Sequence, residues 1–176
     1  MLRLIPFYCG THKGLLPDLA RSLESAFGLA VERHPPGFDP ETAFDPSRGQ
    51  YNSRVLLAKL LDEAPVGAER ILGVTAVDLF IPVLTYVFGE AQLDGRAALV
   101  STHRLDTTVY GLPENRRLLG ERLRKEAIHE LGHTCNLLHC EESLCVMHSS
   151  TYVEEIDLKS DRFCSRCGLS VAFGSG

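Results

Sequence analysis

Three histidines and one glutamate in a short run have the residue types and spacing of a catalytic metal site. They occur within HELGHTCNLLH as His129, Glu130, His133 and His139. Residues four apart on an α-helix lie on one face, so His129 and His133 can bind one metal ion. Glu130 is rotated by about 100° from His129, where its carboxylate can act as general base toward a water on the metal. The spacing predicts a catalytic zinc site.

His139 can join these ligands only if the helix ends before it. Six residues past His133 amount to about 240° of net rotation on a continuous helix. Asn136 offers an end, because asparagine is second to glycine in tolerating the left-handed conformation that closes a helix. We therefore expect a break at Asn136, with His139 as the third ligand and the fourth zinc position left for water. The alternative, a chance match on an amphipathic helix, leaves the third histidine unexplained.

Four cysteines follow in two closely spaced pairs, Cys-x4-Cys and Cys-x2-Cys. They are Cys140, Cys145, Cys164 and Cys167. Two such pairs can supply four thiolates to a tetrahedral structural zinc. The alternative is two disulfides, which we consider less favoured because the N-terminus lacks the build of a signal peptide and disulfides belong to oxidising compartments. We expect Cys9 and Cys135 to be core residues.

These motifs together resemble the archaemetzincins, a branch of the metzincin zinc peptidases. The family pattern is HExxHxxGxxx, then Cys-x4-Cys-x-Met and a later Cys-x2-Cys. The matching positions are His129, Glu130, His133, Asn136, Cys140, Cys145, Met147, Cys164 and Cys167. This part of the likeness covers about the last third of the chain, and the upstream runs GVTAVDLF and FGEAQLDGRAALVSTHRL extend it across the domain.

The resemblance implies an α/β (α+β) zincin-like fold, in which a mixed twisted sheet packs on helices and one long helix carries the active site. Residues 1–176 would form a single metallopeptidase catalytic domain. The upper subdomain, residues 1–139, would contain the sheet and the active-site helix. The lower subdomain, residues 140–176, would contain a methionine turn, the four-cysteine zinc site and a C-terminal helix.

The resemblance also implies two zinc ions per chain. The catalytic zinc would bind the three histidines, and Glu130 would be the general base as a zinc-bound water hydrolyses a peptide bond. The structural zinc would bind the four cysteines, and Met147 would form the methionine turn beneath the catalytic ion. The peptide or protein substrate would lie antiparallel to the strand around residues 96–101, which would form the upper rim of the cleft.

Two departures from the family pattern stand out. Asn136 replaces the usual glycine, and the tyrosine that follows the turn methionine in some metzincins is missing, with Tyr152 as a weak substitute. One alternative function is therefore a non-catalytic peptide-binding protein on the same scaffold. A zinc-ribbon interaction module would explain the cysteines and leave the histidines and Glu130 unexplained.

Composition narrows the class of protein further. A chain of 176 residues with 44% hydrophobic and 23% charged residues is the size and type of one globular domain. The net charge of −5 argues against a nucleic-acid partner, and the only basic clusters, Arg116-Arg117 and Arg122-Arg124-Lys125, are interpreted as the solvated face of a helix. No apolar run approaches the ~20 residues of a membrane span. We expect a cytoplasmic monomer without a membrane partner.

The histidine site must be positioned by the elements around it. Apolar spacing predicts helices over residues 15–27, 52–63, from Pro113 to about Cys135, and 154–171. Apolar runs predict strands over residues 2–8, 70–79, 84–88 and 96–101, with a hairpin turn at 93–95 and a surface loop over 34–50. His12, His34, His103, His148 and Asp78 lack partner spacing, so we expect them to have structural roles.

Overall fold

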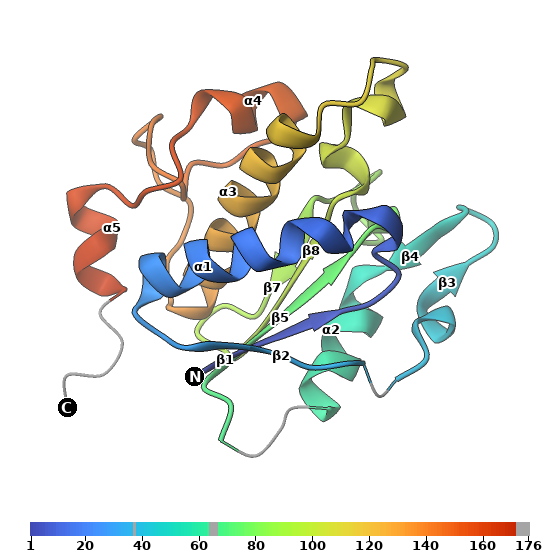
Figure 1. Ribbon diagram of the computed structural model, residues 1–176, viewed down its shortest axis with the longest axis horizontal. Coiled ribbons are helices and arrows are strands. Elements are labelled where there is room, and N and C mark those ends of the chain that lie inside the picture. Colours follow the sequence, from blue (N-terminus) through green and yellow to red (C-terminus); the bar gives the residue numbers. More distant parts are fainter. Residues whose placement is uncertain (37, 64–66, 172–176) are drawn as a thin grey trace.

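A five-stranded mixed sheet forms the centre of the protein (Figure 1). This computed structural model describes residues 1–36, 38–63 and 67–171. The strand order is β2-β1-β5-β8-β7; neighbouring strands are parallel except for β7, which pairs antiparallel with β8 at the edge. The strands are β1 (Leu2–Pro6), β2 (Val31–Arg33), β5 (Arg70–Thr75), β7 (Gly89–Ala91) and β8 (Ala97–Ser101). The β7–β8 pair confirms the predicted hairpin.

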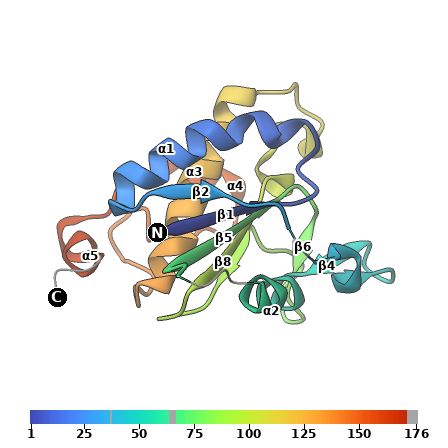
Figure 2. The same ribbon diagram turned by 60° about the horizontal axis from the view of Figure 1, so that its bottom comes forward.

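Helices cover both faces of this sheet (Figure 2). The helices are α1 (Leu16–Phe27), α2 (Ser53–Asp62), α3 (Arg116–Thr134), α4 (Val153–Leu158) and α5 (Ser165–Ser170), with 3-10 turns at Gly10–Leu15, Pro40–Ala43, His103–Leu105 and Thr107–Tyr110. Side chains of β8 alternate between two buried clusters, because successive strand residues point to opposite faces. Ala98 and Val100 pack with α1 and α3, whereas Ala97 and Leu99 pack with α2.

Local capping residues set the helix ends. Helix α1 ends at Gly28 with φ of 65°, as its sequence predicts. Helix α3 begins three residues later than the predicted start at Pro113, because the Asn115 side chain accepts a hydrogen bond from the Leu118 N–H at 3.0 Å. None of the helices in the described parts of the chain is both long enough and apolar enough to cross a membrane.

Two predicted strands differ in the structure. The prediction over 70–79 is too long, since β5 ends earlier and residues Leu79–Phe80 form β6 in a second sheet, ordered β3-β4-β6 with β3 (Phe44–Asp45) and β4 (Gln50–Asn52). The strand predicted over 84–88 is wrong. That segment is a loop with a single β-bridge between Val87 and Leu79. The Arg48 guanidinium donates to the carbonyl oxygens of Leu84 and Thr85 at 3.0 and 3.1 Å. A side chain thus supplies hydrogen bonds that a neighbouring strand would otherwise make.

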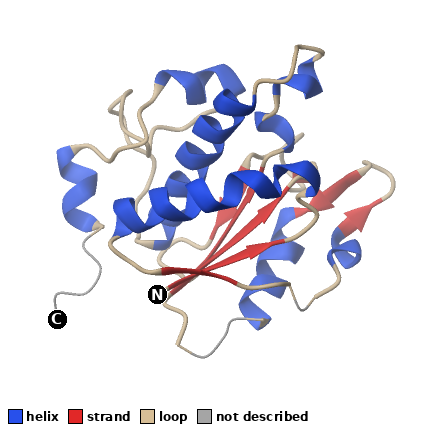
Figure 3. Ribbon diagram, viewed as in Figure 1, coloured by secondary structure: helices blue, strands red, loops and turns tan. Residues whose placement is uncertain are grey.

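After α3, the described residues 135–171 form only short helices and loops (Figure 3). The single helix predicted over 154–171 is instead two helices, α4 and α5. Lys159 and Cys164, at the two ends of the linker, have extended backbone with ψ of 159° and 170°, and bends lie between them. This linker lets Lys159 turn inward, where it is 2% exposed, and brings Cys164 toward the other cysteines.

Basic residues of α3 attach this C-terminal segment to the rest of the domain. The Arg122 side chain is buried and pairs with both carboxylate oxygens of Asp157 at 2.8 and 2.7 Å, and Arg124 pairs with Asp161 at 2.9 Å. Lys125 donates to carbonyl oxygens of α4 at 2.9 and 3.1 Å. The prediction of a solvated helix face was therefore wrong for these three residues, because partners far along the chain pair with their charges; Arg116 and Arg117 are exposed, as predicted.

Candidate metal centre

The active-site helix ends where the sequence predicted. Asn136 has φ of 64°, and the N–H groups of Asn136 and Leu137 donate to the carbonyl oxygens of His133 and Gly132 at 3.0 and 3.2 Å. These bonds close the last turn of α3 and reverse the chain. Asparagine thus does what glycine does in the family pattern, and His139 returns toward the helix.

Three imidazoles converge as a result, and we call His129, His133 and His139 the histidine centre. Their candidate ligand atoms all lie within 4.8 Å of one another. The ring centroids are 4.7 to 5.3 Å apart, and the Nε2 atoms of His129 and His133 are 3.1 Å apart. Two nitrogens bound tetrahedrally to one zinc would be about 3.3 Å apart. The spacing therefore fits a shared zinc ion.

Hydrogen bonds and burial favour the neutral form of these imidazole rings, which is the form that binds metal. The Nδ1 atoms of His129 and His133 lie 2.8 and 2.7 Å from the carbonyl oxygens of Val146 and Leu137. A carbonyl only accepts, so each Nδ1 carries the proton and each Nε2 lone pair is free for metal. Burial lowers the pKa of His129 well below its ordinary value, and burial also lowers the pKa of His133 and of His139.

Glu130 lies buried beside this centre, against the edge strand β7. Burial raises its pKa well above the ordinary value, and the neighbouring carboxylate of Glu126 raises it further. A methyl group on Gly89 would lie 2.7 Å from the Glu130 carboxylate and 2.5 Å from the Leu99 carbonyl oxygen. Gly89 thus makes room for Glu130. The sequence analysis missed this residue, although it stands in the quoted run FGEAQLD.

Met147 lies directly under the helix that carries the histidines, and it is fully buried. A methyl group on Gly132 would come within 2.4 Å of the Met147 sulfur, so this glycine allows the close approach. The residue before Met147 supplies the carbonyl that orients His129. Met147 was predicted from the sequence and Gly132 was not, although a glycine inside a helical pattern often marks a close packing contact.

A buried ion pair joins this turn to α3 and was also missed. Lys159 Nζ lies 2.9 Å from Glu126 Oε1, with side-chain exposures of 1% and 4%. The contact is an ion pair and not an aligned hydrogen bond, since Oε1 has no hydrogen-bond partner in the described structure. The same ammonium donates to the His148 carbonyl at 3.1 Å. One lysine thus holds the methionine turn against the helix.

The cysteine centre consists of the two predicted pairs, Cys140, Cys145, Cys164 and Cys167, whose Sγ atoms lie within 4.8 Å of one another. The Sγ atoms of Cys140 and Cys164 are 3.9 Å apart. This distance exceeds the ~2.05 Å of a disulfide and is near the ~3.8 Å expected for two thiolates on one zinc. Burial raises the pKa of Cys140, but hydrogen bonds from the Glu142 N–H and from Arg166 outweigh it and lower the pKa to about 7. All four cysteines are unlinked in the structure, which contradicts the disulfide alternative, and their spacing suits a metal.

The remaining candidate residues lie outside both clusters. Cys9 is buried, donates to the Val74 carbonyl at 3.1 Å, and has its pKa raised by burial to about 11, as expected of a core thiol. Asp78 binds Arg104 through Nε at 2.8 Å, which confirms its structural role. His12, His34, His103 and His148 belong to neither metal cluster of the described structure.

A cavity of about 690 Å³ opens over the histidine centre. Its walls are loop 84–88, strand β7, the three histidines with Glu130, and residues 149–152. Strand β8 lies between β5 and β7, so the predicted rim at residues 96–101 was wrong and β7 forms the rim. The chain enters the sheet at β7, and the hairpin turn then places β8 between β7 and β5, so the edge falls on β7.

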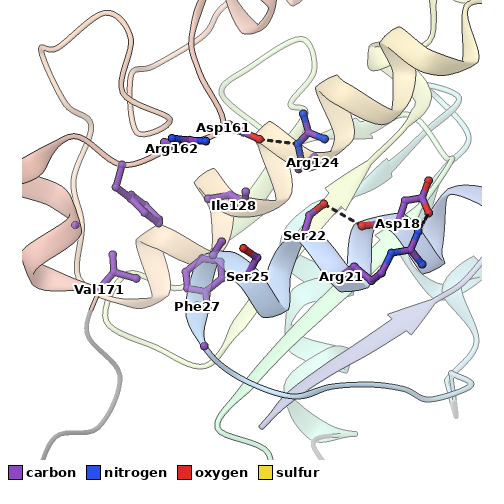
Figure 4. A pocket seen from close by; sticks show the side chains of 14 residues that line it. Asp18, Arg21, Ser22, Ser25, Phe27, Arg124, Ile128, Asp161, Arg162 and Val171 are labelled. Atoms are coloured by element: carbon purple, nitrogen blue, oxygen red, sulfur yellow. Dashed lines mark hydrogen bonds and ion pairs between the residues drawn. The ribbon is translucent and has the colours of Figure 1, made fainter.

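A larger hollow of about 1060 Å³ lies between α1, α3 and α5 (Figure 4). Its lining contains charged pairs such as Arg124 with Asp161, and includes no histidine or cysteine among the described residues. The larger cavity therefore lacks the histidine and cysteine ligands that both metal clusters use, and the histidine cavity remains the candidate site.

Three converging imidazoles and a buried carboxylate, on a helix that flanks a mixed sheet, define the class of zinc metallopeptidases. Residues 37–172 match peptidase family M54. The archaemetzincin of Methanocaldococcus jannaschii is 42% identical over 153 residues, which span 87% of this chain and 83% of that protein. The chain therefore belongs to the archaemetzincins, peptidase family M54, and is a zinc metallopeptidase.

Solved structures agree with this assignment. The crystal structure of archaemetzincin from Methanopyrus kandleri has a TM-score of 0.85 and 36% identity, and the match covers 97% of this chain and 92% of that one. A zinc-dependent peptidase from Methanocorpusculum labreanum has a TM-score of 0.85 and 29% identity, covering 97% and 100%. These matches confirm the predicted zincin-like fold.

Proposed function

We propose that this protein hydrolyses peptide bonds with a zinc ion held by His129, His133 and His139, and with Glu130 as general base. The observation that carries the proposal is the 3.1 Å separation of the His129 and His133 Nε2 atoms, with both Nδ1 atoms bonded to carbonyl oxygens. That arrangement suits a single metal ion with an open side toward the cavity.

Zinc, when bound there, supplies Lewis-acid activation of water and of the substrate carbonyl. Glu130 then accepts a proton from the attacking water and donates it to the leaving amine. A carboxylate whose pKa is raised by burial is better matched to both transfers near neutral pH. The free edge of β7 can add main-chain hydrogen bonds to an extended peptide.

We propose a second, structural zinc in the cysteine centre. Cys140 directly follows His139, so a metal on the four thiolates would also fix the third histidine. In the proposed lower subdomain, the described residues 140–171 form only short helices and loops, and such segments gain order from metal binding. Unlinked thiols at this spacing favour a reducing compartment, and we propose a cytoplasmic monomer.

Replacing Glu130 with glutamine tests the mechanism. The variant should retain two zinc ions per chain by metal analysis, while peptide hydrolysis falls by about 10²- to 10⁴-fold. Glu114→Gln, an exposed position just before α3, is the matched control and should retain full activity. Full activity in Glu130→Gln would refute the assigned role.

The competing function is peptide binding without catalysis. A wild-type protein with two bound zinc ions that cleaves no member of a random peptide library, yet retains some members on a column, would support that alternative over the peptidase.

A further inference from the structure

One hydrogen bond crosses the histidine cavity from wall to wall. The Tyr86 hydroxyl donates to the Thr151 carbonyl at 3.0 Å, and both residues line the cavity. Tyr86 belongs to the loop that leads into β7, whereas Thr151 follows the methionine turn. The bond thus joins the two opposite rims.

Tyr86 is held firmly on its own side. Its ring packs edge-on against Phe88 with centroids 5.5 Å apart, and the Arg104 guanidinium lies 4.8 Å from the ring centroid. Arg104 is itself fixed by Asp78. These contacts leave the ring little freedom to swing out of the cavity.

Thr151 is fixed on the other side. Its N–H and that of Tyr152 donate to the Glu155 carboxylate at 2.5 and 2.9 Å, which caps α4. Helix α4 is attached to α3 through the Arg122–Asp157 pair. The two ends of the crossing bond are therefore both anchored to the structure that carries the histidines.

The other end of the cavity has a different character. Leu93 and Leu138 line it and are 51% and 67% exposed. Leu93 lies in the β7–β8 turn and Leu138 lies just before His139. The two exposed leucine side chains make this end apolar. The turn is joined to α3 here through a backbone bond from the Asp94 N–H to the His133 carbonyl at 3.0 Å, and not through a side chain that spans the cavity.

Strand direction tells which end of a peptide meets the crossing bond. Strand β7 runs from Gly89 to Ala91, with Tyr86 before it and Leu93 after it. A peptide pairing antiparallel with the free edge, the more stable arrangement per residue, runs from Leu93 toward Tyr86. Its C-terminal side therefore lies at the crossing bond.

The closed end also presents an unpaired donor. The Ser150 Oγ is buried, and no hydrogen-bond partner exists for it among the described residues. Ser150 lines the same cavity, next to Thr151. Buried hydroxyls normally have a partner. If the Ser150 side chain turns into the cavity when a peptide binds, the carboxylate at the end of that peptide would accept its hydrogen bond.

We propose that the Tyr86–Thr151 bond closes the cavity on the C-terminal side of the scissile bond, so that the protein removes residues from the free C-terminal end of peptides. This inference rests on the proposed peptidase function. The reaction is ordinary hydrolysis: the C–N bond breaks, the hydroxyl of water joins the acyl carbon, and a proton joins the leaving amine. The exposed leucines select apolar residues on the N-terminal side.

One ten-residue apolar peptide, joined to a folded carrier protein at either end, tests the proposal with the zinc-loaded enzyme. The form with the carrier at the N-terminus should be cut, and mass spectrometry should place the first cut near the free C-terminus. The form with the carrier at the C-terminus should be cut at least tenfold more slowly. Equal rates on the two forms, or faster cutting of the second, would overturn the proposal.

Variants then connect this preference to the crossing bond. Tyr86→Phe removes only the hydroxyl and should narrow the difference in kcat/KM between the two forms by roughly three- to tenfold, as for the loss of one hydrogen bond. Tyr86→Ala should narrow it further. Tyr110→Phe is the control, since its hydroxyl donates to the Arg104 carbonyl at 2.9 Å outside the cavity. An unchanged ratio in both Tyr86 variants would overturn the assignment.

Two failures remain distinguishable. If the wild type cuts neither carrier form nor the free peptide, the proposed function itself fails and this inference falls with it. If the free peptide is cut and the two carrier forms are cut at the same rate, only the proposal that the cavity is closed on the C-terminal side is refuted.

Discussion

The histidine centre and the cysteine centre are adjacent in the chain, but they stand on different kinds of secondary structure. Two of the three histidines stand on a 19-residue helix that packs on the central sheet. The four cysteines stand on loops and on the start of a short helix. The fold therefore positions the first centre, whereas we expect metal in the second centre to stabilise the fold around it. The histidine centre opens to a cavity and the cysteine centre is largely buried.

The largest expected effect is on protein stability, and it should differ between a variant of the cysteine centre and a variant of the histidine centre. Cys164→Ser should remove one zinc ion, lower the free energy of unfolding by about 3 kcal/mol or more, and abolish hydrolysis, because His139 loses its fixed position. His133→Ala should also remove one zinc ion and abolish hydrolysis, while the unfolding temperature changes much less. Metal analysis and thermal unfolding of the two variants check this. An equal loss of stability in both variants would contradict the claim that the cysteine centre stabilises the fold more than the histidine centre does.

The next effect tests the connection between the methionine turn and the helix. Lys159→Met leaves the buried Glu126 carboxylate without its cation, and should destabilise the protein by about 3–5 kcal/mol. Adding Glu126→Gln to that variant should restore part of the loss, as measured by urea unfolding. A double variant as unstable as the single one would show that the pair does not act as a unit.

A smaller effect concerns the close approach of Met147 to α3. Gly132→Ala should destabilise the protein by about 1–3 kcal/mol through overpacking, because the new methyl group meets the Met147 sulfur at 2.4 Å. Gly120→Ala is the control on the same helix, where the nearest side-chain atom would be 3.6 Å away. That change should be neutral or stabilising by up to about 1 kcal/mol. Thermal unfolding of both proteins compares them.

The smallest effect is a pH dependence of the zinc-free protein. Burial raises the pKa of Glu130 in the folded state, so between its ordinary value and the raised one the folded state binds more protons than the unfolded state. Its contribution to stability is thus lost as pH rises through the raised pKa. Glu130→Gln removes this titration, and its stability advantage over wild type should grow with pH. Urea unfolding across a pH series measures it, and a constant difference would contradict the assigned burial.

Local pattern was enough to predict much of the site and part of the fold. The helical spacing of His129 and His133, the left-handed residue Asn136 and the Gly28 helix end depend on neighbours within a few residues, so sequence reasoning reached them. The strand predicted at 84–88 failed because Arg48, far back in the chain, satisfies that backbone. The solvated face predicted for Arg122 failed for the same kind of reason.

The sequence by itself determined the chemistry of this protein: which side chains can bind metal, which carboxylate stands beside them, and where the helix must end. Those properties follow from residue type and from the fixed rise and turn of a helix. Only the tertiary structure decided that β7 and not β8 forms the rim, that Lys159 meets Glu126, and that Tyr86 reaches Thr151. Such pairings join residues distant in the chain, and they depend on how the elements pack and not on any local spacing.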